Sequence, residues 1–230
     1  MTAAATSGLA ARLADVLAVD PSADAVEFQG RWRTWGDLTH TVERVAALVE
    51  RPGTQVGILL RNRPACIGAL LGVLRAGGCV VAINPGRGEE RTRDDVAALD
   101  LALIVGEPDD LARFVPEDLP ATRVAVADLG TSVDVERAAA CAPPEAKEGG
   151  TAACAPPEAR DRPGVAVRML TSGTTGPPKR IDLSYPTLER VLVGAKHYES
   201  DQDGAVRLRR GVAVVNSPLV HLGGLFRVLQ

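Results

Sequence analysis

Residues 55–83 indicate the fold class; their sequence is QVGILLRNRPACIGALLGVLRAGGCVVAI. The runs 55–60 and 79–83 are strand candidates, because each is short, almost entirely apolar and bounded by Gly, Pro or Arg. Between them, residues 64–74 have the composition and length of a helix, and Gly77-Gly78 would end it. A strand, a helix and a second strand in this order predict two parallel strands joined by a crossover helix.

The same alternation continues on both sides of this unit. The expected elements are a helix over 9–17, a hairpin of 25–28 with 31–34, a helix behind a Thr34/Asp37 capping box, a helix over 89–99, a strand over 101–105, a helix over 109–114, a strand over 123–127, a strand over 164–170, a strand-like run over 181–185, a helix over 188–195 and a buried strand over Val212–Val215. Apolar strands that alternate with helices predict an α/β protein with mostly parallel sheets, flanked by helices on both faces.

Composition excludes several classes of protein. The 230 residues have a formal net charge of −3 and only 3% aromatic residues, which argues against a nucleic-acid partner. No apolar run is suited to spanning a membrane and no signal peptide opens the chain, so we expect a cytoplasmic protein. The four cysteines lack metal-site spacing, which predicts reduced structural thiols and no metal site. His40 and His197 fall on polar helix faces and are expected to be solvated.

Three segments are predicted. Residues 1–127 form an N-terminal α/β subdomain, 128–162 an Ala/Pro-rich disordered loop, and 163–230 the start of a second α/β subdomain. The loop contains CAPPEA twice, and two copies are too few for a solenoid.

The chain stops at Gln230 inside an apolar run, so we expect it to be truncated. We also expect uncovered apolar surface at this edge, which would favour self-association. That surface would comprise Leu222, Leu225 and Phe226.

The densest chemical signal is TSGTTGPPK at 171–179. Glycines let backbone amides approach a ligand, hydroxyls add donors, and one of only three lysines in the chain supplies positive charge for phosphate oxygens. The spacing differs from that of the G-x-x-x-x-G-K-[ST] loop, and the alternative is a solvated Gly/Thr-rich turn. We favour a polyphosphate-binding loop. Its candidate ligands are Thr171, Ser172, Gly173, Thr174, Thr175, Gly176 and Lys179.

Three stretches together resemble a known family. Residues 170–179, LTSGTTGPPK, resemble the signature loop of acyl-adenylate-forming enzymes, which include acyl-CoA synthetases, luciferases and the adenylation domains of peptide synthetases. Residues 73–85, VLRAGGCVVAINP, and 217–225, SPLVHLGGL, are similar to two further motifs of that family. The resemblance implies the N-terminal part of the large domain of such an enzyme. Its adenine-binding strand, magnesium-binding Glu, ribose-binding Asp and catalytic Lys would then follow Gln230.

The resemblance also implies a reaction. Family members convert a carboxylic acid and ATP·Mg²⁺ to an acyl-adenylate, and most then transfer the acyl group to a thiol such as coenzyme A. Residues 171–176 and Lys179 would grip the β- and γ-phosphates, His221 would border the acyl pocket, and Gly223 and Gly224 would leave room for the acyl chain. No catalytic residue is assigned within this chain, which by itself is expected to be inactive.

The variant SGTTG, together with the His-x-x-Gly run, favours a ligase that joins a fatty or aryl acid to coenzyme A. The alternatives are an adenylation domain of a peptide synthetase-like system and a short non-catalytic protein that binds a nucleotide or a partner. A pseudoenzyme is suggested only by Arg180, which stands where the family usually has Gly.

Overall fold

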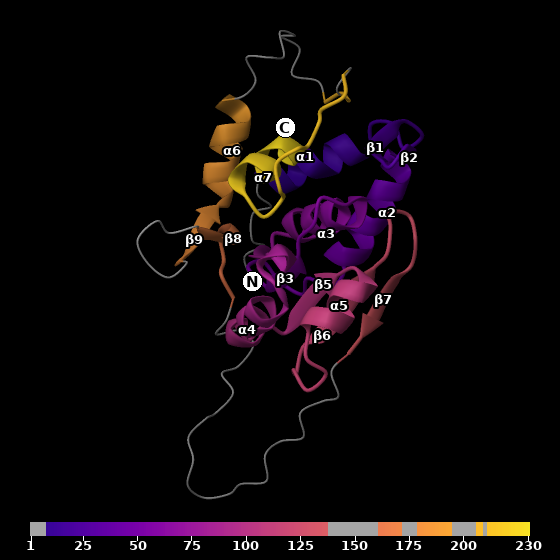
Figure 1. Cartoon of the computed structure of the whole chain (residues 1–230). Helices are drawn as coiled ribbons and strands as arrows, with labels where there is room; N and C mark the ends of the chain where they lie inside the picture. The colour runs from indigo at the N-terminus through magenta and orange to yellow at the C-terminus, as the bar shows by residue number, and fades with distance from the viewer. Residues whose placement is uncertain (1–7, 138–160, 172–178, 195–205, 209–210) are drawn as a thin grey trace, which may run out of the picture.

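The structure is a computed structural model that describes residues 8–137, 161–171, 179–194, 206–208 and 211–230 (Figure 1). Its strands are β1 (Asp24–Phe28), β2 (Arg31–Thr34), β3 (Gln55–Leu59), β4 (Cys79–Ile83), β5 (Leu103–Gly106), β6 (Thr122–Val126), β7 (Val133–Glu136), β8 (Val165–Thr171) and β9 (Lys179–Ser184). Its helices are α1 (Gly8–Leu17), α2 (Trp35–Ala46), α3 (Pro64–Arg75), the 3-10 helix η1 (Pro85–Arg87), α4 (Glu89–Leu99), α5 (Pro108–Phe114), α6 (Tyr185–Gly194) and α7 (Leu222–Leu229).

Seven strands form one sheet in the order β7-β6-β5-β3-β4-β8-β9. The five inner strands are parallel, whereas β7 and β9 pair antiparallel at the two edges. The unit at residues 55–83 is the centre of this sheet, with β3 and β4 paired from Gln55↔Cys79 to Leu59↔Ile83. The predicted mostly parallel α/β fold is therefore confirmed. β1 and β2 form a separate two-stranded hairpin.

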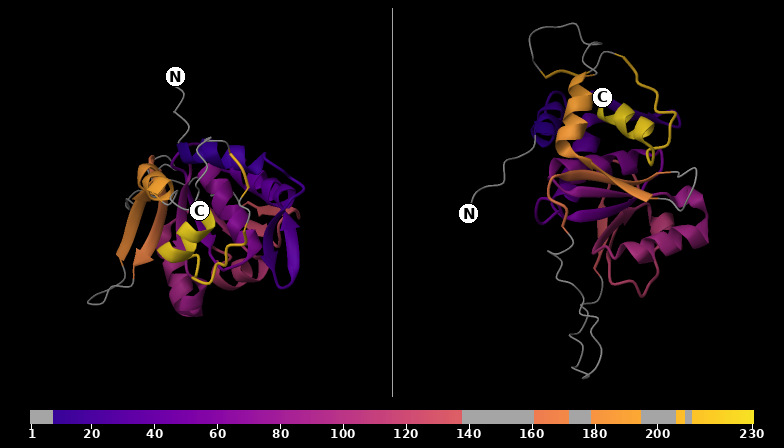
Figure 2. Two further views of the ribbon diagram at one scale, coloured as in Figure 1. Left: turned by 90° about the horizontal axis from the view of Figure 1, so that it is seen from above. Right: turned by 90° about the vertical axis from the view of Figure 1, so that its left-hand side faces the viewer.

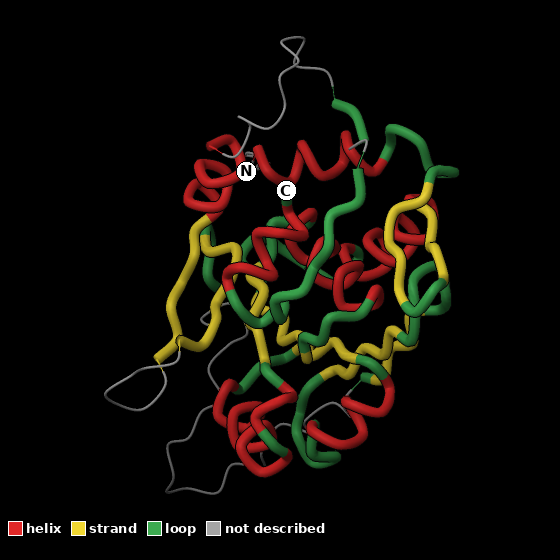
Figure 3. Tube along the Cα trace, turned by 45° about the horizontal axis from the view of Figure 1, so that its top comes forward, coloured by secondary structure: helices red, strands yellow, loops and turns green. Residues whose placement is uncertain are grey.

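Both faces of the sheet are apolar. Alternate residues of each strand point to opposite sides, so each apolar strand contributes side chains to both faces. In β3, Val56 and Ile58 join one hydrophobic cluster, whereas Leu59 joins another. The first cluster includes side chains of α3, α6 and α7, and the second includes side chains of α4 and α5. Figure 3 shows the strands as a yellow band between helices on its two sides, and Figure 2 gives the same arrangement from two other directions.

The order of the strands creates a switch point at β3. The connection from β3 to β4 runs through α3 on one face, and the connection from β4 to β5 runs through α4 on the other face. β4 and β5 consequently lie on opposite sides of β3. In open α/β sheets, ligands bind outside the carboxyl ends of the strands near such a point.

Two local predictions were wrong. Val133–Glu136, placed in a loop by the sequence, form β7, because the alternating Val-Asp-Val-Glu run buries Val133 while it pairs with β6. Val212–Val215, predicted to be a buried strand, pair with no described strand, and Val212 is 75% exposed. This run instead belongs to the segment before α7, where the carbonyl of Val215 accepts from the side-chain amide of Asn62 at 3.4 Å rather than from a strand.

The Ala/Pro-rich repeat at 138–160 lies outside the described residues, and the division of the chain into subdomains stays a prediction. β8 and β9, which follow that segment, extend the same sheet as β3 and β4. After that segment, the amide of Arg162 donates to the carbonyl of Gly53, just before β3, at 2.8 Å.

The compositional predictions are tested for part of the chain. Cys66 and Cys79 are buried free thiols, and burial raises the pKa of each to about 12. His40 is exposed on α2, as expected, and His197 lies outside the described residues. Across the described ranges, no helix has both the length and the apolar character that crossing a bilayer requires.

Candidate functional site

The predicted phosphate loop is described only at its two ends. Thr171 is the last residue of β8, Lys179 is the first residue of β9, and the two are paired across the hairpin. The Thr171 hydroxyl donates to the carbonyl oxygen of Lys179 at 3.0 Å, which closes the neck of the loop. Ser172, Gly173, Thr174, Thr175 and Gly176 lie outside the described residues.

Lys179 is exposed, and its place in β9 assigns it to a face of the sheet. Lys179 and Ile181 share one face because they are two residues apart in a strand. Ile181 packs against the hydrophobic cluster that contains Leu219 and Leu225, so Lys179 belongs to the face covered by α7. The side chain of Arg180 points to the opposite face.

Arg180, which departs from the family pattern, is held firmly on that opposite face. Its guanidinium donates to the carbonyl of Ala82 in β4 at 3.0 Å and to a carboxylate oxygen of Asp95 in α4 at 2.7 Å. The backbone needs no glycine here, because Gln29 and Asp100 are the described non-glycine residues with positive φ. The chain therefore continues along β9 directly after Lys179.

The segment that precedes His221 is fixed by Asn62, a residue that the sequence analysis missed. The side-chain amide of Asn62 accepts from the amide of Leu219 at 2.8 Å and donates to the carbonyls of Ser217 at 2.9 Å and Val215 at 3.4 Å. Asn62 follows the central strand β3. A polar residue just after the carboxyl end of such a strand is a sequence signal for a site residue. Its partners are more than 150 residues away, and only the fold shows that they meet.

His221 is the N-cap residue of α7 and is exposed, with an extended backbone (φ −116°, ψ 153°). Its side chain makes no capping hydrogen bond. Its amide donates to the carbonyl of Pro218 at 3.0 Å, which closes the turn before the helix. The imidazole is exposed, and its hydrogen-bond partners do not include any group of the described residues.

The two predicted glycines differ in their surroundings. Gly223 is exposed, whereas Gly224 is buried against the backbone of Pro218, with which any Cβ at that position would collide. Close backbone approach is a sufficient reason for glycine at 224. Their contact with an acyl chain stays a prediction. The expected apolar edge is partly wrong: Leu222 is 40% exposed, but Leu225 is only 1% exposed and Phe226 is partly buried, because both belong to or pack against one hydrophobic cluster of helix and strand residues.

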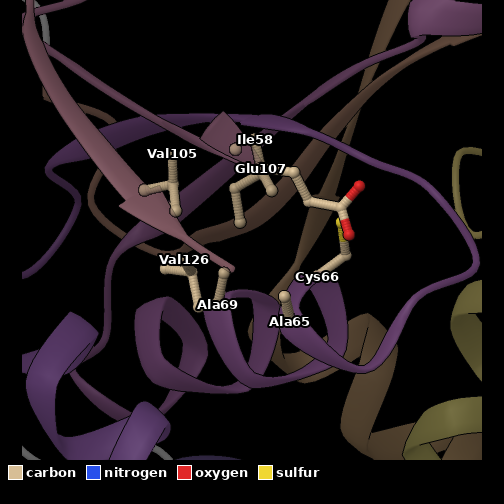
Figure 4. A pocket seen from close by; sticks show the side chains of 8 residues that line it. Ile58, Ala65, Cys66, Ala69, Val105, Glu107 and Val126 are labelled. Atoms are coloured by element: carbon tan, nitrogen blue, oxygen red, sulfur yellow. The ribbon is translucent and has the colours of Figure 1, made fainter. Parts of the chain in front are cut away.

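Neither of two hollows in the described part of the chain is lined by Lys179 or His221. Figure 4 shows the first, between α3 and the strand ends, where Cys66 and Glu107 lie at one side of an apolar lining. It offers no volume to a water molecule. The second cleft has a volume of about 160 Å³ and is lined by Phe28, Gln29, Arg31, Arg33, Arg63, Pro64, Glu107, Ala127 and Asp128.

Charges in the second cleft are largely satisfied within the protein. Arg63 pairs with Glu107 at 3.3 Å, and Arg33 hydrogen-bonds to Asp128. Burial raises the pKa of Glu107, and the hydrogen bond from Arg33 lowers the pKa of Asp128. Within the described ranges, no group of three or more His, Cys, Asp or Glu side chains could hold a metal ion.

Lys179 and the His221 segment lie at the same end of the sheet, where the parallel strands reach their carboxyl ends. Thr171 and Lys179 lie at the carboxyl end of β8, and Asn62 follows the carboxyl end of β3. One strand, β4, separates β3 from β8, which places these two anchor points roughly 10 Å apart across the sheet. An ammonium group and an imidazole on one face of this end of the sheet can bind an anionic ligand that extends between them.

The chain is similar to known proteins over most of its length. The family model described as AMP-binding enzyme matches residues 13–229. An L-proline–[L-prolyl-carrier protein] ligase of Streptomyces coelicolor is 28% identical over 71% of this chain and 32% of its own length. A medium/long-chain-fatty-acid–CoA ligase of Mycobacterium tuberculosis is 31% identical over 73% of this chain and 27% of its own length.

Solved structures with the same fold include MatB of Rhodopseudomonas palustris, at a TM-score of 0.63 and 22% identity over 96% of this chain and 42% of that one. The O-succinylbenzoate coenzyme A synthetase of Bacillus subtilis, solved with AMP, has a TM-score of 0.60 and 16% identity over 94% of this chain and 51% of that one. The chain thus spans about half or less of each protein that it resembles here.

Proposed function

Because this chain belongs to the AMP-binding enzyme family, whose members form adenylates, we propose that its protein converts a carboxylic acid and ATP to an acyl-adenylate and pyrophosphate. A carboxylate oxygen of the acid attacks the α-phosphorus of ATP. A new bond forms between that oxygen and phosphorus, the bond from the α-phosphorus to the bridging oxygen breaks, and pyrophosphate leaves with the bonding electron pair.

The observation that carries this proposal is the placement of Lys179 at the carboxyl edge of the sheet, on the face covered by α7. We assign residues 172–176 and Lys179 to the β- and γ-phosphates, whose charge increases as pyrophosphate departs. Thr171 closes the neck of this loop, because its hydroxyl proton is donated to the carbonyl of Lys179. An ammonium directed at developing charge stabilises the transition state more than the ground state. His221, exposed at the start of α7, is assigned to the acyl pocket beside Gly223 and Gly224.

Magnesium enters this proposal only as the ion that accompanies ATP. Among the described residues, no group of three or more His, Cys, Asp or Glu side chains could hold the ion. What this chain contributes is positive charge at the terminal phosphates and one wall of the acid site.

We propose coenzyme A as the acceptor of the acyl group and a fatty or aryl acid as the substrate. The thiolate attacks the acyl carbon, the thioester bond forms and AMP leaves. Support comes from the SGTTG and His-x-x-Gly patterns and from the similarity to a fatty-acid–CoA ligase. A carrier-protein thiol is the second candidate, because the proline–carrier-protein ligase is comparably similar.

The first test concerns Lys179. In the protein at its full length, Lys179→Ala is expected to slow acid-dependent pyrophosphate release about 10–1000-fold, since one transition-state charge contact is lost. Lys147→Ala, which removes a lysine from the Ala/Pro-rich segment, is the matched control and should leave the rate unchanged. Equal rates for Lys179→Ala and wild type would show that Lys179 does not contact the phosphates.

The second test identifies acid and acceptor. Short, long and aromatic acids are supplied with ATP·Mg²⁺, and thioester formation is measured with coenzyme A and with a phosphopantetheinylated carrier protein. Acyl-CoA formation supports the proposal, whereas an acylated carrier protein alone assigns the protein to carrier-dependent ligases. If ATP binds but no acid stimulates pyrophosphate release, the non-catalytic nucleotide-binding alternative holds instead.

A further inference from the structure

The end of the β8–β9 hairpin projects beyond the strand to which β8 is paired. The β4–β8 ladder comprises Val80↔Val167 and Val81↔Arg168. The β8–β9 pairing continues further, through Leu170↔Arg180 to Thr171↔Lys179. The part of the hairpin that carries Lys179 is therefore not held to β4 by backbone pairing, and its position depends on side-chain contacts.

Ile181 packs on the α7 face, and Arg180 supplies the polar contacts on the α4 face. Its guanidinium reaches the carbonyl oxygen of Ala82, one residue beyond the last β4–β8 pair, at 3.0 Å. It also forms an ion pair with Asp95 of α4 at 2.7 Å. The side chain of Arg180 is 12% exposed and that of Asp95 is 16% exposed, so water competes weakly for this pair. One side chain thus ties the projecting hairpin to both β4 and α4.

We propose that Arg180 and Asp95 are positioning residues for Lys179, an inference that rests on the function proposed above. Neighbouring strand residues point to opposite faces, so the anchor of Arg180 on the α4 face directs Lys179 toward the α7 face. The anchor and the ligand-binding ammonium therefore never compete for the same space. A family position that commonly carries glycine here carries the residue that fixes the hairpin.

The chemistry of the contact requires arginine. The planar guanidinium donates in two directions at once, to a backbone carbonyl and to a carboxylate, whereas a lysine ammonium is a point charge on a flexible stem. Asp95 offers a suitable partner because it lies next to buried Val96 on the packed side of α4. Its neighbour Asp94 is exposed and has no ion-pair partner among the described residues. Asp94 is therefore a matched control.

The experiment compares Asp95→Asn, Arg180→Gln, Arg180→Lys and Asp94→Asn in the full-length protein, with pyrophosphate release as the assay. Asp95→Asn and Arg180→Gln are each expected to lower kcat/KM for ATP roughly 10- to 100-fold, the scale of a small misplacement of a binding group. KM for the acid should change less than twofold, since the His221 segment is anchored separately through Asn62. Arg180→Lys should be intermediate, and Asp94→Asn should match wild type.

Coupling between the two residues gives an independent readout. The double variant Asp95→Asn/Arg180→Gln should lose no more than Arg180→Gln alone, because Arg180→Gln already removes the contact with Asp95 as well as the contact with Ala82. In the 230-residue chain, the same substitutions should speed hydrogen exchange of the β9 amides while leaving β3 protected.

The outcomes separate this inference from the proposed function. Faster exchange with unchanged kinetics for ATP would overturn the positioning role and leave a purely structural ion pair. Additive losses in the double variant would overturn the coupling. A wild-type protein without acid-dependent pyrophosphate release would refute the proposed function, and the inference with it, before any variant is compared.

Discussion

At the scale of single residues, Asn62 connects the carboxyl end of β3 to the segment before His221 through three hydrogen bonds. We predict that Asn62→Ala lowers the free energy of unfolding by about 1–2 kcal/mol, because each such bond contributes roughly 0.5–1.5 kcal/mol and this side chain is exposed. Denaturant unfolding measures the change, and amide hydrogen exchange of Leu219 should accelerate. Asn216→Ala, at an exposed position of the same segment, is the control. Unchanged exchange at Leu219 would contradict the role given to Asn62.

At the scale of elements, the sheet is held on both sides of the Ala/Pro-rich repeat by contacts outside it. β7 pairs with β6 before the repeat, and Asp161 and Arg162 contact Arg51 and Gly53 after it. We predict that deletion of residues 141–160 shifts Tm by only a few degrees, because the closure entropy of a loop grows slowly with its length. Thermal unfolding followed by circular dichroism measures this. A fall in Tm of ten degrees or more would mean that the repeat packs on the core.

At the scale of the whole molecule, the chain corresponds to 42% of MatB, and its described residues bring one exposed ammonium and one imidazole to the candidate site. We predict that the 230-residue chain by itself binds ATP·Mg²⁺ with Kd about 1 mM or weaker. A few polar contacts must offset the entropy of immobilising the nucleotide. Calorimetric titration measures the affinity, and pyrophosphate release should show no dependence on added acid. Micromolar binding, or acid-dependent turnover, would place a complete nucleotide site within these residues.

The sequence by itself determined what depends on near neighbours along the chain. Apolar runs and helical spacing predicted the central strand–helix–strand unit, and the Thr34/Asp37 capping box formed as expected. Closely spaced glycines, hydroxyls and a lysine at 171–179 predicted a phosphate-binding loop, and the resemblance of residues 170–179 to a known signature loop predicted the family that the match over residues 13–229 shows. These signals are local: side-chain direction in a strand or helix repeats every two to four residues.

Only the tertiary structure decided which distant segments meet. Val212–Val215 have strand composition but pair with no described strand, and the carbonyl of Val215 accepts from Asn62 instead. The order of the strands brought Arg180 to Asp95, 85 residues earlier, and Asn62 to Leu219. Such contacts depend on where the crossover helices place each strand. A residue's own neighbours in the sequence carry no record of that placement, and so the supports of the candidate site emerged only from the folded chain.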